Sequence, residues 1–368
     1  MLLARDVLAQ VFGQRLGPLV SGGALAAMRT MGQVGQALDG LLYPALAETP
    51  VRSPVIIIGA PRTGTTFLHR KLVELGVGQG QALWQMLAPA LTLQGVLGPL
   101  VPHLEALSPA RHHNAAAHET SLQAVETEDA ALMFRYFDGL FAYAFLLAWA
   151  EPDLFGEIDP LRPGATARDL AFLERIWRRR MFDTGPGARV VAKAASLALR
   201  VPQILEKFPD ARLIYTVRDP VEAIPSALSL VTSTIQARFG TDGSDLDPAA
   251  QARHRERIYG ALVGLHEEFA RAWSRPSFPR DRVLIVHHDS LVHDCDATMR
   301  EVLHFVNHPI DNAVSTAIQE TDRRQRERRS AHRYDLASFG LTADRIQRDC
   351  ALSLSCFSFP DRAQGAAR

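Results

Sequence analysis

The stretch VIIIGAPRTGTTFLHRKL, Val55–Leu72, decides the fold of this chain. Four β-branched residues run into Gly59, and four further residues separate Gly59 from Gly64. This order predicts a buried strand, a loop bounded by glycines and then a helix. A Walker loop that binds ATP carries a lysine where this chain has Thr65. The stretch therefore predicts a cradle for an oxyanion that lacks the ATP-binding lysine.

The chemistry of this loop favours a phosphate or sulfonate group. A turn from strand to helix directs several backbone N–H groups and the positive end of the helix toward one point. Thr65 and Thr66 add hydroxyls that can donate to phosphate oxygens. Arg62 adds a planar fork that can hold such a group through two hydrogen bonds. The alternative is a tight turn with an incidental arginine, but the strand before it and the helix after it favour binding.

The composition is that of a soluble globular protein large enough for one large domain or two ordinary ones. The chain has 368 residues, of which 47% are hydrophobic and 22% charged. Its 40 basic residues balance its 40 acidic ones, so no overall field attracts nucleic acid or anionic lipid. We therefore expect no nucleic-acid partner, and any anion must be recognised locally.

The cysteines and the chain ends bear on location. Cys295, Cys350 and Cys356 form no CxxC pair, which argues against a disulfide framework and a zinc site. The first twenty residues alternate charged and apolar positions too closely for a signal-peptide core. We expect reduced thiols and a cytoplasmic location.

Two apolar stretches were weighed as membrane spans. Gly139–Ala150 is too short to cross a bilayer, which takes about 20 residues. Leu83–Leu104 is long enough but contains two glutamines and the prolines Pro89 and Pro99. We expect no transmembrane segment, and both stretches are typical of buried or pocket-lining helices.

The order of elements predicts an α/β fold with a P-loop-type parallel sheet flanked by helices. Residues 1–50 have helical apolar spacing and predict an N-terminal extension, followed by one domain over 51–360 with a helical insertion at about 80–185. Strands are expected near 55–59, 189–192, 211–217 and 283–286, with helices near 64–76, 201–208 and 292–306 and another from Pro220. Gly240–Ala250 is the best candidate for a surface loop.

A second candidate element lies at the end of the third expected strand. Arg218, Asp219 and Pro220 follow that strand, and Ser226 comes eight residues after the arginine. Ligands of open α/β sheets bind at the carboxyl ends of the strands. An arginine there and a serine two turns along the next helix could share one phosphate group.

These motifs together resemble the PAPS-dependent sulfotransferases, in particular their bacterial-type branch (PAPS is 3′-phosphoadenosine-5′-phosphosulfate). The loop IIIGAPRTGTTFLH is similar to the family's 5′-phosphosulfate loop, and RDPVEAIPSALSL to its 3′-phosphate element. Ala192–Pro220 resembles its block of lysine, FPDA and RDP, and Ala331–Leu341 its C-terminal signature. The resemblance covers roughly residues 51–345 in the expected order.

The resemblance implies a reaction and a set of binding residues. It implies in-line transfer of a sulfuryl group from PAPS, the co-substrate, to a hydroxyl of a small lipophilic or aromatic acceptor, without a metal. The 5′-phosphosulfate would be held by Arg62, Thr63, Gly64, Thr65 and Thr66, and the 3′-phosphate by Arg218 and Ser226.

The catalytic groups are less defined. Arg62 and Lys193, at a strand end, could stabilise developing charge, although Lys193 could equally be an exposed surface lysine. The base for the acceptor hydroxyl is sought in one stretch with His118, Glu119, Glu126, Glu128 and Asp129, because related enzymes use a histidine or a glutamate. We favour Glu128 with His118 second; a solvated helix start with acidic residues is the plain alternative. The histidines form no metal-binding spacing.

Several features leave alternatives open. The chain has Ala194, Ala195 and Leu197 where the family usually has a proline and a histidine, and it has Trp84-Gln85 in place of a tryptophan–glutamate pair. A catalytically degenerate homologue that binds nucleotide is therefore one alternative. A P-loop kinase or NTPase that uses Asp219 or Asp289 for magnesium is another.

Two further points stay open. The arginine-rich segment Arg323–Arg329 is a solvated helix face or a cover for the 3′-phosphate. The oligomeric state is open, with a homodimer as one option.

Overall fold

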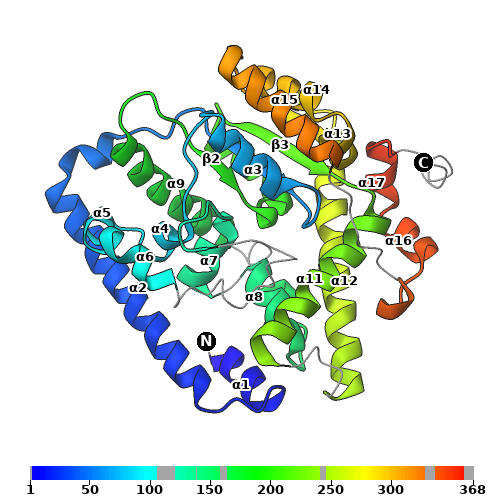
Figure 1. Cartoon of the computed structure of the whole chain (residues 1–368). Helices are drawn as coiled ribbons and strands as arrows, with labels where there is room; N and C mark the ends of the chain where they lie inside the picture. Colours follow the sequence, from blue (N-terminus) through cyan, green and yellow to red (C-terminus); the bar gives the residue numbers. More distant parts are fainter. Residues whose placement is uncertain are drawn as a thin grey trace.

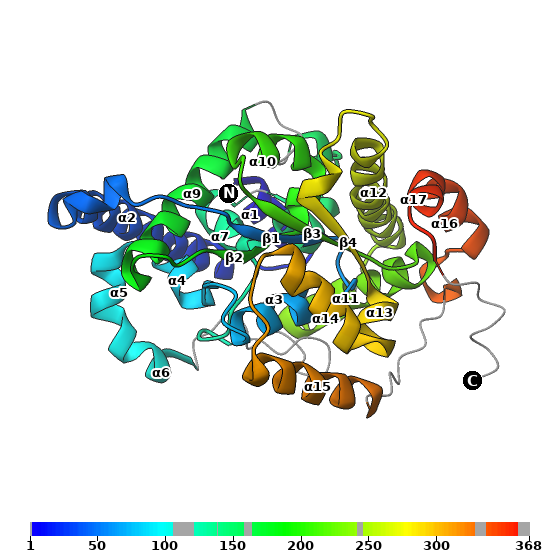
Figure 2. The same ribbon diagram turned by 90° about the horizontal axis from the view of Figure 1, so that it is seen from above.

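A computed structural model describes residues 2–105, 121–137, 139–157, 164–240, 246–327 and 336–359. At its centre lies a parallel sheet in the order β2-β1-β3-β4, seen from above in Figure 2. The strands are β1 (Val55–Gly59), β2 (Val191–Lys193), β3 (Arg212–Val217) and β4 (Val283–His287). The α/β class expected from the sequence is confirmed.

Helices surround this sheet (Figure 1). Those of the described residues are α1 (Leu2–Gln10), α2 (Gly17–Leu42), α3 (Thr65–Glu74), α4 (Leu83–Leu87), α5 (Leu91–Leu97), α6 (Val101–Leu104), α7 (Glu128–Tyr136), α8 (Leu140–Phe145), α9 (Ala165–Thr184), α10 (Val201–Lys207), α11 (Pro220–Phe239), α12 (Pro248–Trp273), α13 (His288–His293), α14 (Cys295–Phe305), α15 (Asn312–Glu327), α16 (Ala343–Asp349) and α17 (Ala351–Cys356).

The sheet is covered on both faces, as a parallel sheet requires. Successive residues of β1 point to opposite sides, so Ile56 and Ile58 join one apolar cluster and Val55 and Ile57 the other. The first cluster includes α9, α10 and α12, and the second includes α3 and α14. Figure 2 shows these two groups of helices above and below the strands. Such burial explains why β1 is an uninterrupted β-branched run.

The chain adds strands to the sheet on both sides of β1. After β1 it forms β2 on one side, and only then adds β3 on the other side of β1. Helix α3, which follows β1, packs into one apolar cluster, whereas α11, which follows β3, packs into the other. The divergence lies at the carboxyl ends of β1 and β3, the place where open α/β sheets bind ligands.

Some element bounds differ from those expected. The helix expected near 292–306 is two helices, α13 and α14, that meet at Asp294. The long helix α12 was not predicted at all. The start of this helix is stabilised by its own first residues. The Asp247 side chain accepts a hydrogen bond from the N–H of Ala250 at 3.0 Å, and Pro248 is the first helical residue. The end of the expected loop Gly240–Ala250 is therefore helical.

The two apolar stretches weighed as membrane spans are short helices. Proline-containing breaks divide Leu83–Leu104 into α4, α5 and α6, and Gly139–Ala150 forms α8 and a 3-10 turn at Leu147–Trp149. Within the described parts of the chain, no helix combines the length and hydropathy of a membrane span.

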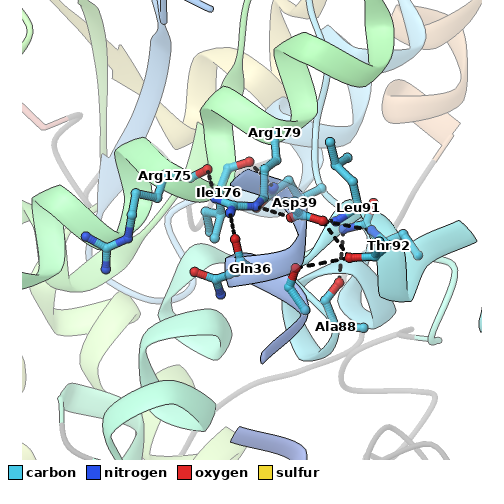
Figure 3. A network of polar contacts seen from close by, with 11 residues as sticks. Gln36, Asp39, Ala88, Leu91, Thr92, Arg175, Ile176 and Arg179 are labelled. Carbon is cyan, nitrogen blue, oxygen red and sulfur yellow. Dashed lines mark hydrogen bonds and ion pairs between the residues drawn. The ribbon is translucent and has the colours of Figure 1, made fainter. Parts of the chain in front are cut away.

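One buried carboxylate attaches the N-terminal helices to the rest of the fold (Figure 3). Asp39 of α2 is fully buried and accepts from the backbone N–H groups of Leu91 and Thr92 at 3.0 and 2.9 Å. The Arg179 guanidinium of α9 donates to the same carboxylate at 2.7 Å. Burial opposes ionisation, but the hydrogen bonds from Thr92, Arg179 and Leu91 outweigh it and lower the pKa of Asp39. A single ionised side chain thus joins α2, α5 and α9.

Candidate functional site

The loop after β1 is tightly constrained. A side chain at Gly59 would place its Cβ 2.5 Å from the Thr216 hydroxyl, so only glycine fits there. Gly64 caps α3 with a φ of 95°, in the left-handed region. Arg62 lies in that region too, with a φ of 73°, which is strained for a residue with a side chain. Such strain concentrates at ligand-binding sites.

The first turn of α3 directs backbone donors into this loop. The helix begins with Thr65, and its first intrahelical hydrogen bond runs from Leu68 N to Gly64 O at 3.1 Å. The N–H groups of Thr65 and Thr66 precede that bond and have no acceptor within the helix. The loop therefore offers the oxyanion-binding geometry that the sequence predicts.

Thr63 contributes differently from its neighbours. It is fully buried, and its hydroxyl lies 2.8 Å from the Ala60 carbonyl and 2.6 Å from the Thr216 hydroxyl. These contacts fasten the loop to the end of β3. The Thr63 hydroxyl therefore holds the loop and is not directed at a ligand.

The two candidate anion-binding elements meet at the carboxyl ends of β1 and β3. Arg62 donates through Nε to the Ser226 hydroxyl of α11 at 3.0 Å. Arg218, at the tip of β3, donates through Nη1 to the Arg62 carbonyl at 3.3 Å. Residues more than 150 positions apart in the sequence therefore form one cluster.

The guanidinium of Arg218 has a local partner as well. Its Nε and Nη2 donate to Glu222, in the first turn of α11, at 3.2 and 3.1 Å. About half of the Glu222 side chain is exposed, whereas that of Arg218 is mostly buried. Glu222 would compete with an anionic ligand for this arginine.

Lys193 ends β2 beside the loop. Only 6% of the residue is exposed, which excludes the alternative of a surface lysine. Its ammonium donates to the Thr66 hydroxyl at 3.0 Å, and its backbone N–H donates to Glu128 Oε2 at 2.7 Å. Burial lowers the pKa of Lys193, although the carboxylates of Glu126, Asp129 and Glu128 act in the opposite direction.

Glu128, the favoured base, is the first residue of α7 and is fully buried. Its Oε1 has no hydrogen-bond partner among the described residues. Burial raises the pKa of this carboxyl to about 8, against the hydrogen bond from Lys193 N, which lowers it. A pKa near neutrality suits a group that must accept a proton.

The other described acids of the candidate set stabilise the fold through hydrogen bonds or an ion pair. The Asp129 carboxylate accepts from the backbone N–H groups of Ala195 and Ser196 at 2.7 and 3.2 Å. Glu126, which precedes α7 instead of lying within it, pairs with Arg70 at 3.0 Å. His118 and Glu119 lie outside the described residues. Among the described acids of this candidate set, Glu128 is the one with a buried carboxylate oxygen that has no hydrogen-bond partner.

The sequence reasoning missed the attachment of α7 to β2. The Thr127 hydroxyl donates to the Lys193 carbonyl at 2.9 Å, and with the bonds of Glu128 and Asp129 it forms a clasp over residues 193–196. The signal was present: a threonine followed by two acids is typical of a helix N-cap, and Thr127 does cap α7. The sequence does not show which part of the chain the start of α7 contacts.

The arginine-rich segment is exposed where the structure describes it. Arg324 pairs with Glu320 at 2.7 Å and Arg326 with Asp322 at 2.7 Å, each within α15. Arg328 and Arg329 lie outside the described residues, as does the first half of Ala331–Leu341.

One described cavity lies away from this cluster. It measures about 370 Å³ and lies beside Gly78, Gln79 and Arg189, at the amino end of β2. The candidate site lies at the carboxyl end of the sheet, where ligands bind in this class of fold.

Comparison with known proteins agrees with the geometry. The model of the sulfotransferase family matches residues 54–312. The chain belongs to the sulfotransferase family. Curated relatives include the omega-hydroxy-beta-dihydromenaquinone-9 sulfotransferases Stf3 of Mycobacterium bovis and Mycobacterium tuberculosis, each 28% identical over 193 residues. The match covers 50% of this chain and 47% of each relative, so it spans about half their length.

Solved structures share the fold. Sulfotransferase STF1 of Mycobacterium tuberculosis has a TM-score of 0.69 at 18% identity, with 95% of this chain and 90% of that one covered. Sulfotransferase STF9 of Mycobacterium avium has a TM-score of 0.65 at 20% identity, with 92% and 86% covered.

Membership of the sulfotransferase family excludes the alternative of a P-loop kinase or NTPase. The two aspartates considered as magnesium ligands have other roles in the structure. Asp219 caps α11, where its carboxylate accepts from Val221 N at 2.8 Å. Asp289 lies in the first turn of α13, with its carboxylate 3.4 Å from His288 Nδ1. The lysine position of a Walker loop is occupied by Thr65, the first residue of α3.

Proposed function

We propose that this member of the sulfotransferase family transfers a sulfuryl group from PAPS to a hydroxyl of a small lipophilic acceptor. The observation that carries the proposal is the meeting of Arg62, Ser226 and Arg218 at the carboxyl ends of β1 and β3. One cluster thereby offers donors for two separate anionic groups of one nucleotide. A nucleotide with phosphates at both the 3′ and 5′ positions requires that arrangement.

Each part of the cluster has a role in binding. The N–H groups of Thr65 and Thr66 and the fork of Arg62 would hold the 5′-phosphosulfate, while Arg218 and Ser226 would hold the 3′-phosphate. The tight contacts at Gly59 and the buried hydroxyl of Thr63 support the fit, because they let the loop backbone approach a ligand closely.

The groups next to the loop supply the chemistry. In the transfer, a bond forms between the acceptor oxygen and sulfur while the bond from sulfur to the 5′-phosphate oxygen breaks. Glu128 would take the proton of the acceptor hydroxyl. Lys193, hydrogen-bonded to Thr66 beside the loop, would stabilise the negative charge that develops on the leaving oxygen. The Thr127–Asp129 clasp holds both groups in place.

A lipophilic acceptor is supported by the surroundings of Glu128 and by the relatives. Helices α4 and α8 pack beside α7, and they place Leu83, Met86 and Leu140 in its apolar neighbourhood. The curated relatives act, by name, on a hydroxylated dihydromenaquinone. We propose a lipophilic alcohol or phenol as the acceptor class here.

The domain limits and the location are part of the proposal. We propose a sulfotransferase domain over residues 51–360, with an insertion at about 80–185 and an N-terminal helical extension over 1–50. The family match over residues 54–312 supports the core of that division. We propose a cytoplasmic protein that needs no metal ion.

The proposal is tested with ³⁵S-labelled PAPS and a panel of lipophilic alcohols and phenols. Label should move to at least one acceptor, and Arg62→Ala should reduce both the transfer and the affinity for adenosine 3′,5′-bisphosphate, measured by calorimetry. Binding of the bisphosphate without transfer to any acceptor would point to the degenerate homologue. Absence of both binding and transfer would overturn the proposal.

A further inference from the structure

The outward side of α2 exposes large apolar side chains near both of its ends. In Figures 1 and 2 this helix runs along one flank of the molecule, with no other labelled element outside it. Its large side chains expose between 44% (Leu38) and 77% (Leu41) of their surface. The exposed large apolar residues of the helix and of the residue before it are Leu16, Leu19, Val20, Met31, Val34, Leu38, Leu41 and Leu42, which we call the α2 face.

The α2 face carries no charge. The only charged residues of the helix are Arg29 and Asp39. Arg29 donates to the Phe134 carbonyl at 2.7 Å, and Asp39 is buried against α5 and α9. Both charges of α2 are therefore used to attach the helix, and its outer side is left without any.

The face is large for the surface of a monomer. Its eight side chains together expose on the order of 800 Å², which is about what each partner contributes to a standard protein interface. Monomeric soluble proteins rarely leave an apolar patch of more than a few hundred Å² uncovered. A second surface must cover this one.

Four of the eight residues of the face are placed symmetrically about Ala27. Leu16 and Leu38 lie eleven residues on either side of it, and Val20 and Val34 lie seven on either side. These spacings keep them all on one side of the helix. Four residues on either side of Ala27 lie an exposed glycine, Gly23, and an exposed methionine, Met31.

We propose that α2 is the interface of a homodimer, in which two copies of the helix pair antiparallel about a two-fold axis at Ala27. Each Met31 then packs into the space left by the partner copy's Gly23, because a Cβ there would meet nothing within 4 Å apart from the neighbouring backbone of its own helix. Val20 lies opposite Val34, and Leu16 opposite Leu38. A two-fold interface has this self-complementary form.

The charge distribution favours a second copy over a lipid surface. Helices that lie on membranes carry lysine and arginine along their polar side. The exposed residues of α2 include none, and the chain as a whole has no net charge to repel another copy. An uncharged, self-complementary face suits an identical partner.

The first test changes the centre of the interface. Ala27→Arg places two positive charges against each other at the axis, so the variant should run as a monomer in size-exclusion chromatography with light scattering at concentrations where the wild type is a dimer. Ser21→Arg adds the same charge to the same helix outside the face and should stay dimeric. Both residues are exposed, so thermal unfolding should match the wild type.

The second test measures the register. With Cys356 replaced by serine, Ala27→Cys should form a disulfide-linked dimer when a mild oxidant is added, because the two thiols meet at the axis. Leu41→Cys should not, because its two copies would lie about 42 Å apart along the paired helices. Efficient cross-linking at position 41 but not at 27 would contradict this pairing.

The outcomes separate the dimer from its alternatives without measuring activity. A wild type that is monomeric at all accessible concentrations overturns the proposal. So does sedimentation of that monomer with phosphatidylcholine–phosphatidylglycerol vesicles through the same face. A dimer that Ala27→Arg leaves intact overturns it as well.

Discussion

Glu128 is the residue on which the proposed chemistry depends. It is fully buried, one of its oxygens is unsatisfied among the described residues, and the other accepts from the backbone of Lys193. Glu128→Gln keeps the shape of the side chain but cannot take a proton. We expect kcat to fall by roughly 100-fold or more, with the affinity for adenosine 3′,5′-bisphosphate unchanged. Steady-state kinetics and calorimetry measure the two quantities.

The matched control for that substitution is Glu126→Gln, two residues earlier. It removes the ion pair with Arg70 but leaves the unsatisfied oxygen of Glu128 in place. Turnover should change by only a few-fold. If Glu128→Gln retains full turnover, the base is elsewhere, and His118 becomes the leading candidate.

The raised pKa of Glu128 also makes stability depend on pH. Burial raises the pKa from 4.5 to about 8, so the folded state binds a proton that the unfolded state has lost at intermediate pH. The resulting stabilisation is complete below about pH 4.5 and is lost as the pH rises through about 8. Relative to Glu128→Gln, the wild type should lose up to about 1.4 kcal/mol per pH unit over that window. Urea unfolding at pH 5, 7 and 9 measures this, and parallel curves for the two proteins would contradict it.

At the scale of elements, the clasp between α7 and β2 sets the relative position of Glu128 and Lys193. Asp129→Ala removes the acceptor for Ala195 N and Ser196 N. We expect a loss of about 1–3 kcal/mol in stability. Because Glu128 and Lys193 then lose their fixed separation, the pH optimum of kcat should move as well. A stability loss with an unchanged pH profile would show that the clasp supports the fold alone.

At the start of α11, the pair of Arg218 and Glu222 predicts a gain of affinity. Glu222→Gln removes the carboxylate that competes for the Arg218 guanidinium. Adenosine 3′,5′-bisphosphate should bind up to about fivefold tighter at low salt, because a pair of this exposure contributes at most about 1 kcal/mol. Glu206→Gln, an exposed change of the same charge on α10, should leave the affinity unaltered. Equal effects of both variants would mean that only net charge matters.

The helices and strands also show how much of the fold can be predicted from the sequence. The β-branched run of β1, the loop up to Gly64 and the strand before Arg218 were each predicted, because local patterns determine them. The adjacency of β1 and β3, which brings Arg62 to Ser226, was anticipated only through the family resemblance. Helix α12 was not predicted, although its Asp-Pro start is a local helix signal. The α7 clasp was missed because a Thr-Glu-Asp start marks a helix without showing what it packs against.

At the scale of the whole molecule, Asp39 connects segments that lie far apart in the chain. Asp39→Ala would leave the Arg179 guanidinium and the N–H groups of Leu91 and Thr92 without their acceptor in a buried place. We expect a loss of about 3–5 kcal/mol in the free energy of unfolding, measured by urea denaturation. Thr92→Val keeps the backbone N–H bond and removes only the hydroxyl, which lies 2.6 Å from Asp39 Oδ1, so it should cost about 1 kcal/mol. Equal losses for the two variants would argue against a buried ion pair at this position.

No local pattern predicts this connection. A lone aspartate in an alanine- and glycine-rich helix gives no sign of an arginine 140 positions later. The sequence therefore predicts that residues 1–50 are helical but not that they are bonded into the insertion. Long-range polar contacts of this kind depend on the packed fold.

The hydrogen bond from Arg62 to Ser226 has a consequence for ligand selection. Arg62 belongs to the loop assigned to the sulfate end of the nucleotide, and Ser226 to the element assigned to its opposite end. A ligand that draws Ser226 toward itself must also reorient Arg62, so the two ends are sensed together. A nucleotide that lacks the 3′ group would therefore also bind less well at the reacting end. The site would select nucleotides by the distance between their two anionic groups.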